Sequence, residues 1–156
     1  MRPSFVALLV LSLPAAGTAH AAPSAVEKRI AAAVDQRTDA ALELLAETVN
    51  VPSATENLAG VRAVGEIYAR EFRALGFETR WVDVPPEMKR AGHLVATHRG
   101  KRGGPRLLLI GHLDTVLQGE PFRRDGNRAY GSGSSDMKGG NLVALEALRA
   151  LQATGE

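Results

Sequence analysis

Residues 107–115 read Leu107-Leu108-Leu109-Ile110-Gly111-His112-Leu113-Asp114-Thr115, and this stretch decides the predicted fold. Its first four residues form a continuous apolar run, which is typical of a central strand covered on both faces. In open α/β sheets, ligands bind beyond the carboxyl ends of such strands, and His112 and Asp114 stand at that position. The stretch therefore predicts an α/β fold, with helices on both sides of the sheet and a functional site after Ile110.

The flanking sequence alternates between helical and strand-like patterns. Apolar residues at helical spacing predict a helix from Val26 to Val49, stopped by Pro52. A second helix is predicted from the capping-box sequence at 53–56 to Gly76. The remaining predicted elements are strands over 77–84 and 93–98, a hairpin turn at 125–127 and a helix over 142–151.

The first 21 residues differ from the rest of the chain. An apolar run from Phe5 to Leu13 follows Arg2 and precedes Ala19-His20-Ala21. These are the features of a secretory signal, and the run is shorter than the roughly 20 residues needed to span a bilayer. A retained N-terminal helix is the alternative. We expect a signal peptide over 1–21 and an exported mature chain, secreted or periplasmic, that begins at Ala22 and is not inserted in the membrane.

The composition excludes several classes of protein. The 156 residues are 45% hydrophobic and 23% charged, as in an ordinary globular domain. The formal net charge is only +2, with both signs mixed along the chain, which gives no indication of nucleic-acid binding. Without a single cysteine, the chain has no disulfide, no thiolate zinc ligand and no Cys nucleophile. Metal ligands must therefore come from His, Asp or Glu.

His112 and Asp114 form the first candidate site. They are two residues apart in an extended segment, so both side chains can point to the same face. An imidazole that binds a metal through one nitrogen commonly donates its other N–H to an oxygen, and Asp114 is placed to orient His112 in this way. The alternative is a structural histidine at a strand end, with Asp114 capping a turn. These two residues alone leave both interpretations open.

The second candidate segment is Tyr130-Gly131-Ser132-Gly133-Ser134-Ser135-Asp136-Met137-Lys138-Gly139-Gly140. Its glycines allow the backbone to fold tightly around Asp136, whose two carboxylate oxygens could bridge a pair of metal ions. The alternative is that Asp136 caps the helix that follows. Lys138 lacks the neighbours of a phosphate-binding loop, and the serines do not stand in a G-x-S-x-G elbow, which argues against nucleotide binding and serine hydrolysis.

Taken together, GHLDTV at 111–116 and GSGSSDMKGG at 131–140 resemble the first two metal-site motifs of the dizinc exopeptidase and aminoacylase family. This family includes glutamate carboxypeptidase, succinyl-diaminopimelate desuccinylase and acetylornithine deacetylase. The resemblance covers most of residues 25–154, and it implies a zinc-peptidase α/β sheet flanked by helices and a site for two Zn²⁺ ions, which cobalt could replace. It also implies that His112 binds one zinc, that Asp114 serves catalysis by orienting His112, and that Asp136 bridges both ions.

The same resemblance implies a catalytic domain that is incomplete within 22–156, because the family's Glu base and remaining ligands come later in the chain. We therefore expect an exported, zinc-dependent, carboxypeptidase-like hydrolase of peptide or N-acyl amino acid amide bonds. The resemblance implies a homodimer at full length, and this chain alone is expected to be inactive. The alternatives are a deacylase or desuccinylase of the same family, a non-catalytic exported binding protein that keeps the fold, and a Gly-loop nucleotide binder.

Overall fold

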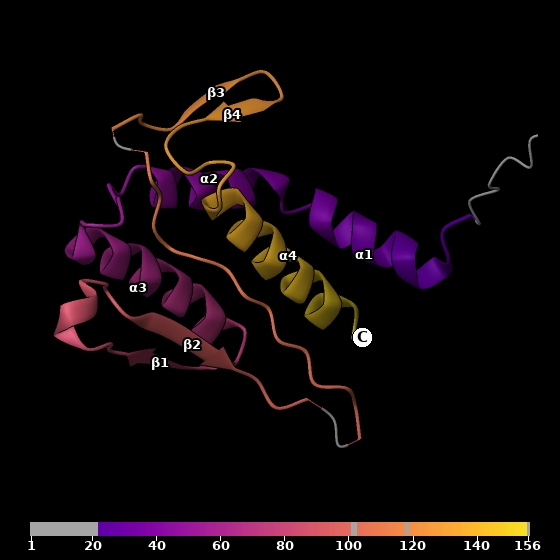
Figure 1. Ribbon diagram of the computed structural model, residues 1–156. Coiled ribbons are helices and arrows are strands. Elements are labelled where there is room, and N and C mark those ends of the chain that lie inside the picture. Colours follow the sequence, from indigo (N-terminus) through magenta and orange to yellow (C-terminus); the bar gives the residue numbers. More distant parts are fainter. Residues whose placement is uncertain (1–21, 101–102, 118, 156) are drawn as a thin grey trace, which may run out of the picture.

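The computed structural model describes residues 22–100, 103–117 and 119–155 (Figure 1). It confirms a mixed α/β fold, with helices and two small antiparallel sheets. The predicted signal peptide, residues 1–21, lies outside the described residues. Within the described part, none of the helices has both the length and the apolar character needed to cross a membrane. In chain order the elements are α1 (Ala25–Asp35), α2 (Thr38–Val49), α3 (Leu58–Ala74), β1 (Glu78–Val82), the short 3-10 helix η1 (Pro86–Met88), β2 (His93–Thr97), β3 (Arg123–Asp125), β4 (Arg128–Tyr130) and α4 (Lys138–Thr154).

The hydrophobic core lies between α2, α3 and α4 (Figure 1). Each helix contributes apolar residues at three- and four-residue spacing, which places them on one face. Val64 and Leu145 are completely buried at its centre. The core residues are Leu44, Leu45, Val49, Val64, Tyr68, Leu75, Leu142 and Leu145. This helical core, rather than a sheet, therefore supports the beginning of α4 and the loop before it.

The predicted first helix is two helices. Gln36 and Arg37 separate α1 from α2, although the apolar spacing continues across them. Arg37 directs its guanidinium to α4, where Nε donates to Oε2 of Glu146 at 2.7 Å. The apolar spacing did not predict the break, because it runs on through these two residues.

The predicted capping box at 53–56 is wrong. The N-cap of α3 is Asn57, whose side chain accepts a hydrogen bond from the backbone N–H of Gly60. Thr55 and Glu56 form a turn before it, and Ala54 forms a parallel bridge with Thr115. The backbone of Ser53 thus pairs with the segment that carries His112 and Asp114 instead of starting a helix.

Two hairpins are present, one formed by the strands predicted over 77–84 and 93–98 and one at the turn predicted at 125–127. In the first, β1 pairs with β2 in antiparallel register from Glu78 opposite Thr97 to Val82 opposite His93. The second, β3 with β4, turns at Gly126, which has the positive φ of 57° that such turns favour. Gly76 also behaves as predicted, because it follows the last turn of α3 with φ 79°.

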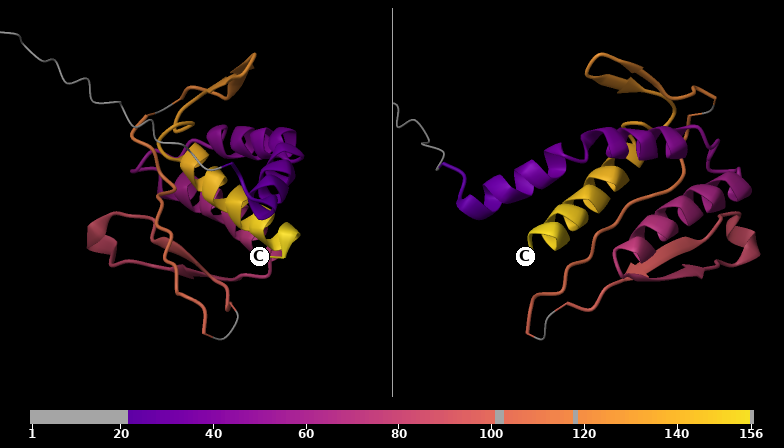
Figure 2. Two further views of the ribbon diagram at one scale, coloured as in Figure 1. Left: turned by 90° about the vertical axis from the view of Figure 1, so that its right-hand side faces the viewer. Right: turned by 180° about the vertical axis from the view of Figure 1, so that it is seen from behind.

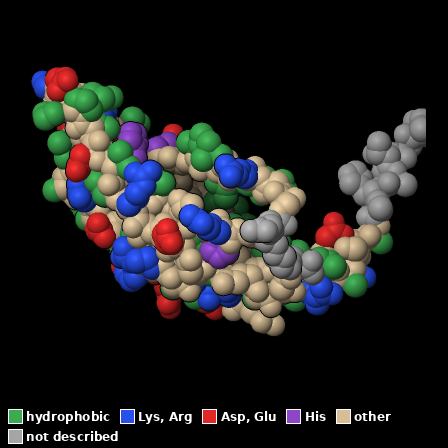
Figure 3. Space-filling view, turned by 90° about the horizontal axis from the view of Figure 1, so that it is seen from below, with side chains coloured by type: hydrophobic (Ala, Val, Ile, Leu, Met, Phe, Trp, Pro, Cys, Tyr) green, Lys and Arg blue, Asp and Glu red, His purple; other side chains and the backbone are tan. Residues whose placement is uncertain are grey.

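Leu107 to Ile110 do not form the predicted central strand. The segment runs beside α4 without belonging to either sheet (Figure 2). Leu107, Leu108 and Ile110 are each more than 80% exposed. No described strand lies alongside this run, and an extended segment becomes a strand only through hydrogen bonds to a neighbour. Hydrophobic side chains are accordingly open on the face of the molecule shown in Figure 3.

Candidate metal centre

The first half of the candidate site is held against the beginning of α4. Asn141, in the first turns of that helix, donates from Nδ2 to the backbone oxygen of His112 at 2.7 Å. A Cβ at Gly111 would lie only 2.1 Å from Oδ1 of Asn141, so glycine is required for this close approach. The contact brings residues 111–112 next to the loop that precedes α4.

Both ring nitrogens of His112 face carboxylates. Nε2 lies 2.9 Å from Oδ1 of Asp136. Nδ1 lies 3.2 Å from Oδ1 of Asp114 and 3.0 Å from the backbone oxygen of Asp114. The three residues selected from the sequence are therefore in contact, with the imidazole between the two acids.

Asp114 is fixed from the opposite side by Thr55. The hydroxyl of Thr55 donates to Oδ2 of Asp114 at 2.6 Å. The two residues lie on neighbouring backbone segments, because the N–H of Thr115 donates to the oxygen of Ser53 and the N–H of Thr55 donates to the oxygen of Thr115. With one oxygen on Thr55 and the other near Nδ1 of His112, Asp114 has the contacts expected of a residue that orients an imidazole.

Asp136 does not cap α4. The N-cap position is taken by Met137, and no side chain caps this helix end. The Asp136 side chain is 83% exposed, and its hydrogen bond goes to His112. Of the two roles considered from the sequence, the cap is not observed. The carboxylate instead meets Nε2 of His112, the nitrogen on the far side of the ring from Asp114.

The electrostatics favour a protonated imidazole. Burial of the ring opposes the charged form, but the hydrogen bond to Asp136 and the contacts with Asp114 outweigh this effect and raise the pKa of His112. A proton on Nε2 then occupies the position at which a metal would bind.

The donors present fit part of a zinc site. Imidazole nitrogen and carboxylate oxygen are both normal zinc ligands, and Nε2 of His112 and Oδ1 of Asp136 converge. Among the described residues, however, no group of three or more His, Cys, Asp or Glu side chains is arranged to hold a metal ion. Zinc usually takes at least three protein ligands, so His112 and Asp136 account for a part of such a site.

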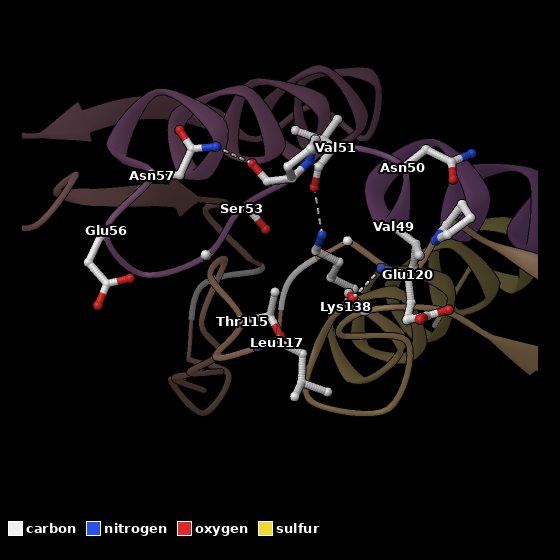
Figure 4. Close-up of a pocket in the computed structure, with 15 residues that line it drawn as sticks. Val49, Asn50, Val51, Ser53, Glu56, Asn57, Thr115, Leu117, Glu120 and Lys138 are labelled. Atoms are coloured by element: carbon white, nitrogen blue, oxygen red, sulfur yellow. Dashed lines mark hydrogen bonds between the residues drawn. The ribbon is translucent and has the colours of Figure 1, made fainter.

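The structure also contains a cavity of about 460 Å³, which is lined by Thr115 and Lys138 among others. Residues 49–54 form one wall, and Thr115 and Lys138 contribute to the other walls (Figure 4). The hydroxyl of Ser53 is buried in this region and has no hydrogen-bond partner among the described residues. His112, Asp114 and Asp136 do not line this cavity.

Sequence comparisons relate the chain to known proteins. The model of "Peptidase family M20/M25/M40" matches residues 108–156, which include His112, Asp114 and Asp136. Carboxypeptidase G2 of Pseudomonas sp. (strain RS-16) is 36% identical over 172 aligned positions, which cover 99% of this chain and 39% of the relative. The chain belongs to peptidase family M20/M25/M40.

Other similar proteins are named for different activities. Succinyl-diaminopimelate desuccinylase of Leptothrix cholodnii is 35% identical, with 62% of this chain and 27% of the relative aligned. Acetylornithine deacetylase of Klebsiella pneumoniae is 37% identical, with 53% of this chain and 23% of the relative aligned. The chain thus spans less than two fifths of the length of each of these relatives.

Three residues that support the candidate site were not selected from the sequence. Thr55 donates to Asp114, and Asn141 donates to the backbone oxygen of His112. Lys138 donates to the backbone oxygen of Val51. Asn141 could have been suspected, because it follows the second motif by one residue. Thr55 is 59 residues from its partner, and only the fold brings the two together.

Proposed function

We propose that this chain carries part of the active site of a zinc-dependent hydrolase that cleaves a peptide or N-acyl amino acid amide bond, with a carboxypeptidase-like preference. The observation that carries the proposal is the 2.9 Å contact between Nε2 of His112 and Oδ1 of Asp136. It brings together two zinc-type donors that are 24 positions apart in the chain, one from each motif. Family membership supports the hydrolytic activity, and the substrate preference follows the similarity to carboxypeptidase G2.

Each residue has a distinct task in the proposed site. His112 and Asp136 would bind zinc through Nε2 and the carboxylate, and Asp136 could offer its second oxygen to another ion. Asp114 would keep the N–H of His112 on Nδ1, so that the lone pair of Nε2 points to the metal. Thr55 would hold Asp114 in place. Bound zinc would act as a Lewis acid that polarises a carbonyl group and lowers the pKa of a water molecule.

A panel of substrates tests the proposal in the protein as the cell makes it. We expect the protein to hydrolyse the amide bond before a C-terminal glutamate. A chelator should abolish this activity, and Zn²⁺ or Co²⁺ should restore it. A preference for N-acetylornithine or N-succinyl-diaminopimelate would instead assign the protein to the deacylase or desuccinylase alternative, which the names of two relatives favour. Binding of these compounds without any turnover would contradict the enzyme and favour the non-catalytic binding protein.

Export and dimerisation are further parts of the proposal. The support for export is the signal-like sequence of residues 1–21. Intact-mass analysis of the protein outside the cytoplasm should show a chain that begins at Ala22, and retention of Phe5 to Leu13 would contradict export. An exported hydrolase of this type would act on small peptides or N-acyl amino acids taken from the surroundings. Sedimentation analysis of the protein made by the cell tests the proposed homodimer.

A further inference from the structure

Lys138 is a completely buried lysine at the start of α4. Its exposed fraction is 0%, and its ammonium group donates to two backbone oxygens, that of Thr48 at 2.8 Å and that of Val51 at 3.0 Å (Figure 4). No carboxylate lies within ion-pair distance of it in the described part of the chain. A lysine is rarely buried in this way, because removing its charge from water is costly. Its position needs a specific explanation.

The end of α2 supplies the partner for this charge. The last carbonyl groups of a helix lack intrahelical N–H partners and carry the negative end of the helix dipole. Thr48 is in the last turn of α2, which ends at Val49, and Val51 follows just beyond. Lys138 therefore acts as a cationic cap on α2, although it belongs to a different helix.

Lys138 also contacts the loop that carries Asp136, through its backbone and its side-chain stem. The backbone N–H of Lys138 donates to the oxygen of Gly133 at 2.9 Å. A Cβ at Gly133 would lie 3.3 Å from Cδ of Lys138, so the loop passes close to the lysine stem. The backbone oxygen of Lys138 accepts a hydrogen bond from the hydroxyl of Tyr68 at 2.8 Å. Asp136 is only two residues before Lys138 in the chain.

The segment that receives Lys138 also holds the other half of the site. Residues 48–51 accept the hydrogen bonds of the ammonium group. A few residues on, Ser53 and Thr55 pair with the backbone of Thr115, and the Thr55 hydroxyl binds Asp114. Residues 48–55 thus contact both motifs, one through Lys138 and the other through Thr115 and Asp114.

We propose that Lys138 is a positioning residue of the metal centre, which sets the position of Asp136 relative to His112 by fixing the start of α4 to residues 48–51. This inference rests on the proposed function for the metal, but the contact that it explains is present in the chain itself. Without the ammonium group, the start of α4 loses its two hydrogen bonds to the segment that leads to Thr55, the residue that supports Asp114. Asp136 would then no longer stay within hydrogen-bond distance of His112.

The test compares two variants that each remove one buried charge from α4. Lys138→Met keeps the length of the stem and removes the ammonium group. Glu146→Gln is the matched control: Glu146 is 7% exposed, pairs with Arg37 and Arg149, and belongs to the same helix away from the site. Both should unfold at lower denaturant concentration than the parent chain. Only Lys138→Met should change the metal centre.

The first readout is the ¹⁵N NMR signal of Nε2 of His112, recorded without metal at one fixed pH. The Asp136→Asn variant serves as the reference, because it lacks the Asp136 carboxylate that contacts Nε2 of His112. We expect the signal in Lys138→Met to move to the Asp136→Asn position and the signal in Glu146→Gln to stay at the parent position. A parent-like His112 signal in folded Lys138→Met would overturn the proposal.

The second readout is the affinity for Co²⁺, followed by its visible absorption spectrum. We expect the Co²⁺ affinity of Lys138→Met to be about tenfold or more lower than that of the parent, as is typical when a residue that orients a metal ligand is lost. Glu146→Gln should keep the parental affinity. If the protein made by the cell binds no Co²⁺, the proposed metal function fails, and the NMR comparison still decides whether Lys138 positions Asp136.

Folding of the variants is controlled separately. The measurements are made in trimethylamine N-oxide, which strengthens burial, and are repeated with Lys138→Gln, which keeps a shorter donor. We expect Lys138→Gln to fold and to shift the His112 signal in the same direction. An unfolded Lys138→Gln under these conditions would overturn the proposal, because it would show that Lys138 serves the fold as a whole.

Discussion

Nε2 of His112 and Oδ1 of Asp136 are 2.9 Å apart, although the two residues are 24 positions apart in the chain. In the metal-free chain this contact is a hydrogen bond between two groups that are both suited to bind zinc. A metal ion that enters must therefore replace the proton between them. The contact links the pH dependence of the chain to its proposed capacity for metal.

The pKa of His112 should lie above the ordinary histidine value of about 6.5 in the metal-free chain. A pKa raised on folding means that the stabilisation by this contact is fully present below the unfolded-state pKa, and that it is lost as the pH rises through the folded-state pKa. An NMR titration of the His112 ring measures the value directly. Asp136→Asn should lower it, and a parent pKa at or below the ordinary value would contradict the geometry.

Thr55→Val should weaken metal binding without removing it. The substitution keeps the shape of the side chain but deletes the 2.6 Å hydrogen bond to Oδ2 of Asp114. Loss of such a supporting partner typically costs about 10–100-fold in metal affinity or activity. Competition titration with a zinc chelator gives the affinity, and Thr97→Val, on an exposed position of β2, is the matched control. Equal affinities in both variants would show that Thr55 does not support Asp114.

Leu145→Ala should destabilise the helical core strongly. Leu145 is completely buried between the helices, and its truncation should cost about 2–5 kcal/mol of unfolding free energy. Val143 is on the same helix but 70% exposed, so Val143→Ala should stay within about 0.5 kcal/mol of the parent chain. Urea denaturation followed by circular dichroism compares them. Similar midpoints for the two variants would contradict the position of the core.

Leu108→Lys should increase the soluble yield of the chain. Leu108 is 82% exposed within an extended apolar run, and such unpaired segments promote aggregation. The substitution removes no buried contact, so the melting temperature should stay unchanged. Sedimentation of the purified chain at increasing concentration measures how strongly the chain associates with itself. A large loss of thermal stability in Leu108→Lys would instead show that the run is buried in solution.

Local patterns in the sequence predicted the elements that depend on local structure. The helix over 142–151, the turn at Gly126 and the end of α3 at Gly76 follow from residue spacing and from the positive φ that glycine allows. The run at 107–110 was predicted as a strand from its apolar character, but strand formation needs a neighbouring backbone that is absent among the described residues.

The candidate site was predicted in its residues but not in its support. His112, Asp114 and Asp136 were selected because their residue types and spacing suit a metal, and the fold brings all three together. The pattern left open whether Asp136 caps a helix or bridges metal ions, since both roles use the same carboxylate. Thr55 and the buried ammonium group of Lys138 had no local signal, because their partners lie 59 and 87–90 residues away.

In the proposed site, His112 and Asp136 bind zinc together. The most direct measurement is the zinc content after equilibrium dialysis of the purified protein and of its His112→Ala, Asp136→Ala and His98→Ala variants. His98 packs against Phe77 with ring centroids 4.9 Å apart, outside the site, and serves as the control. We predict zinc in the parent protein and in His98→Ala, with loss of zinc in both other variants. Parental zinc content in His112→Ala and Asp136→Ala would contradict the account.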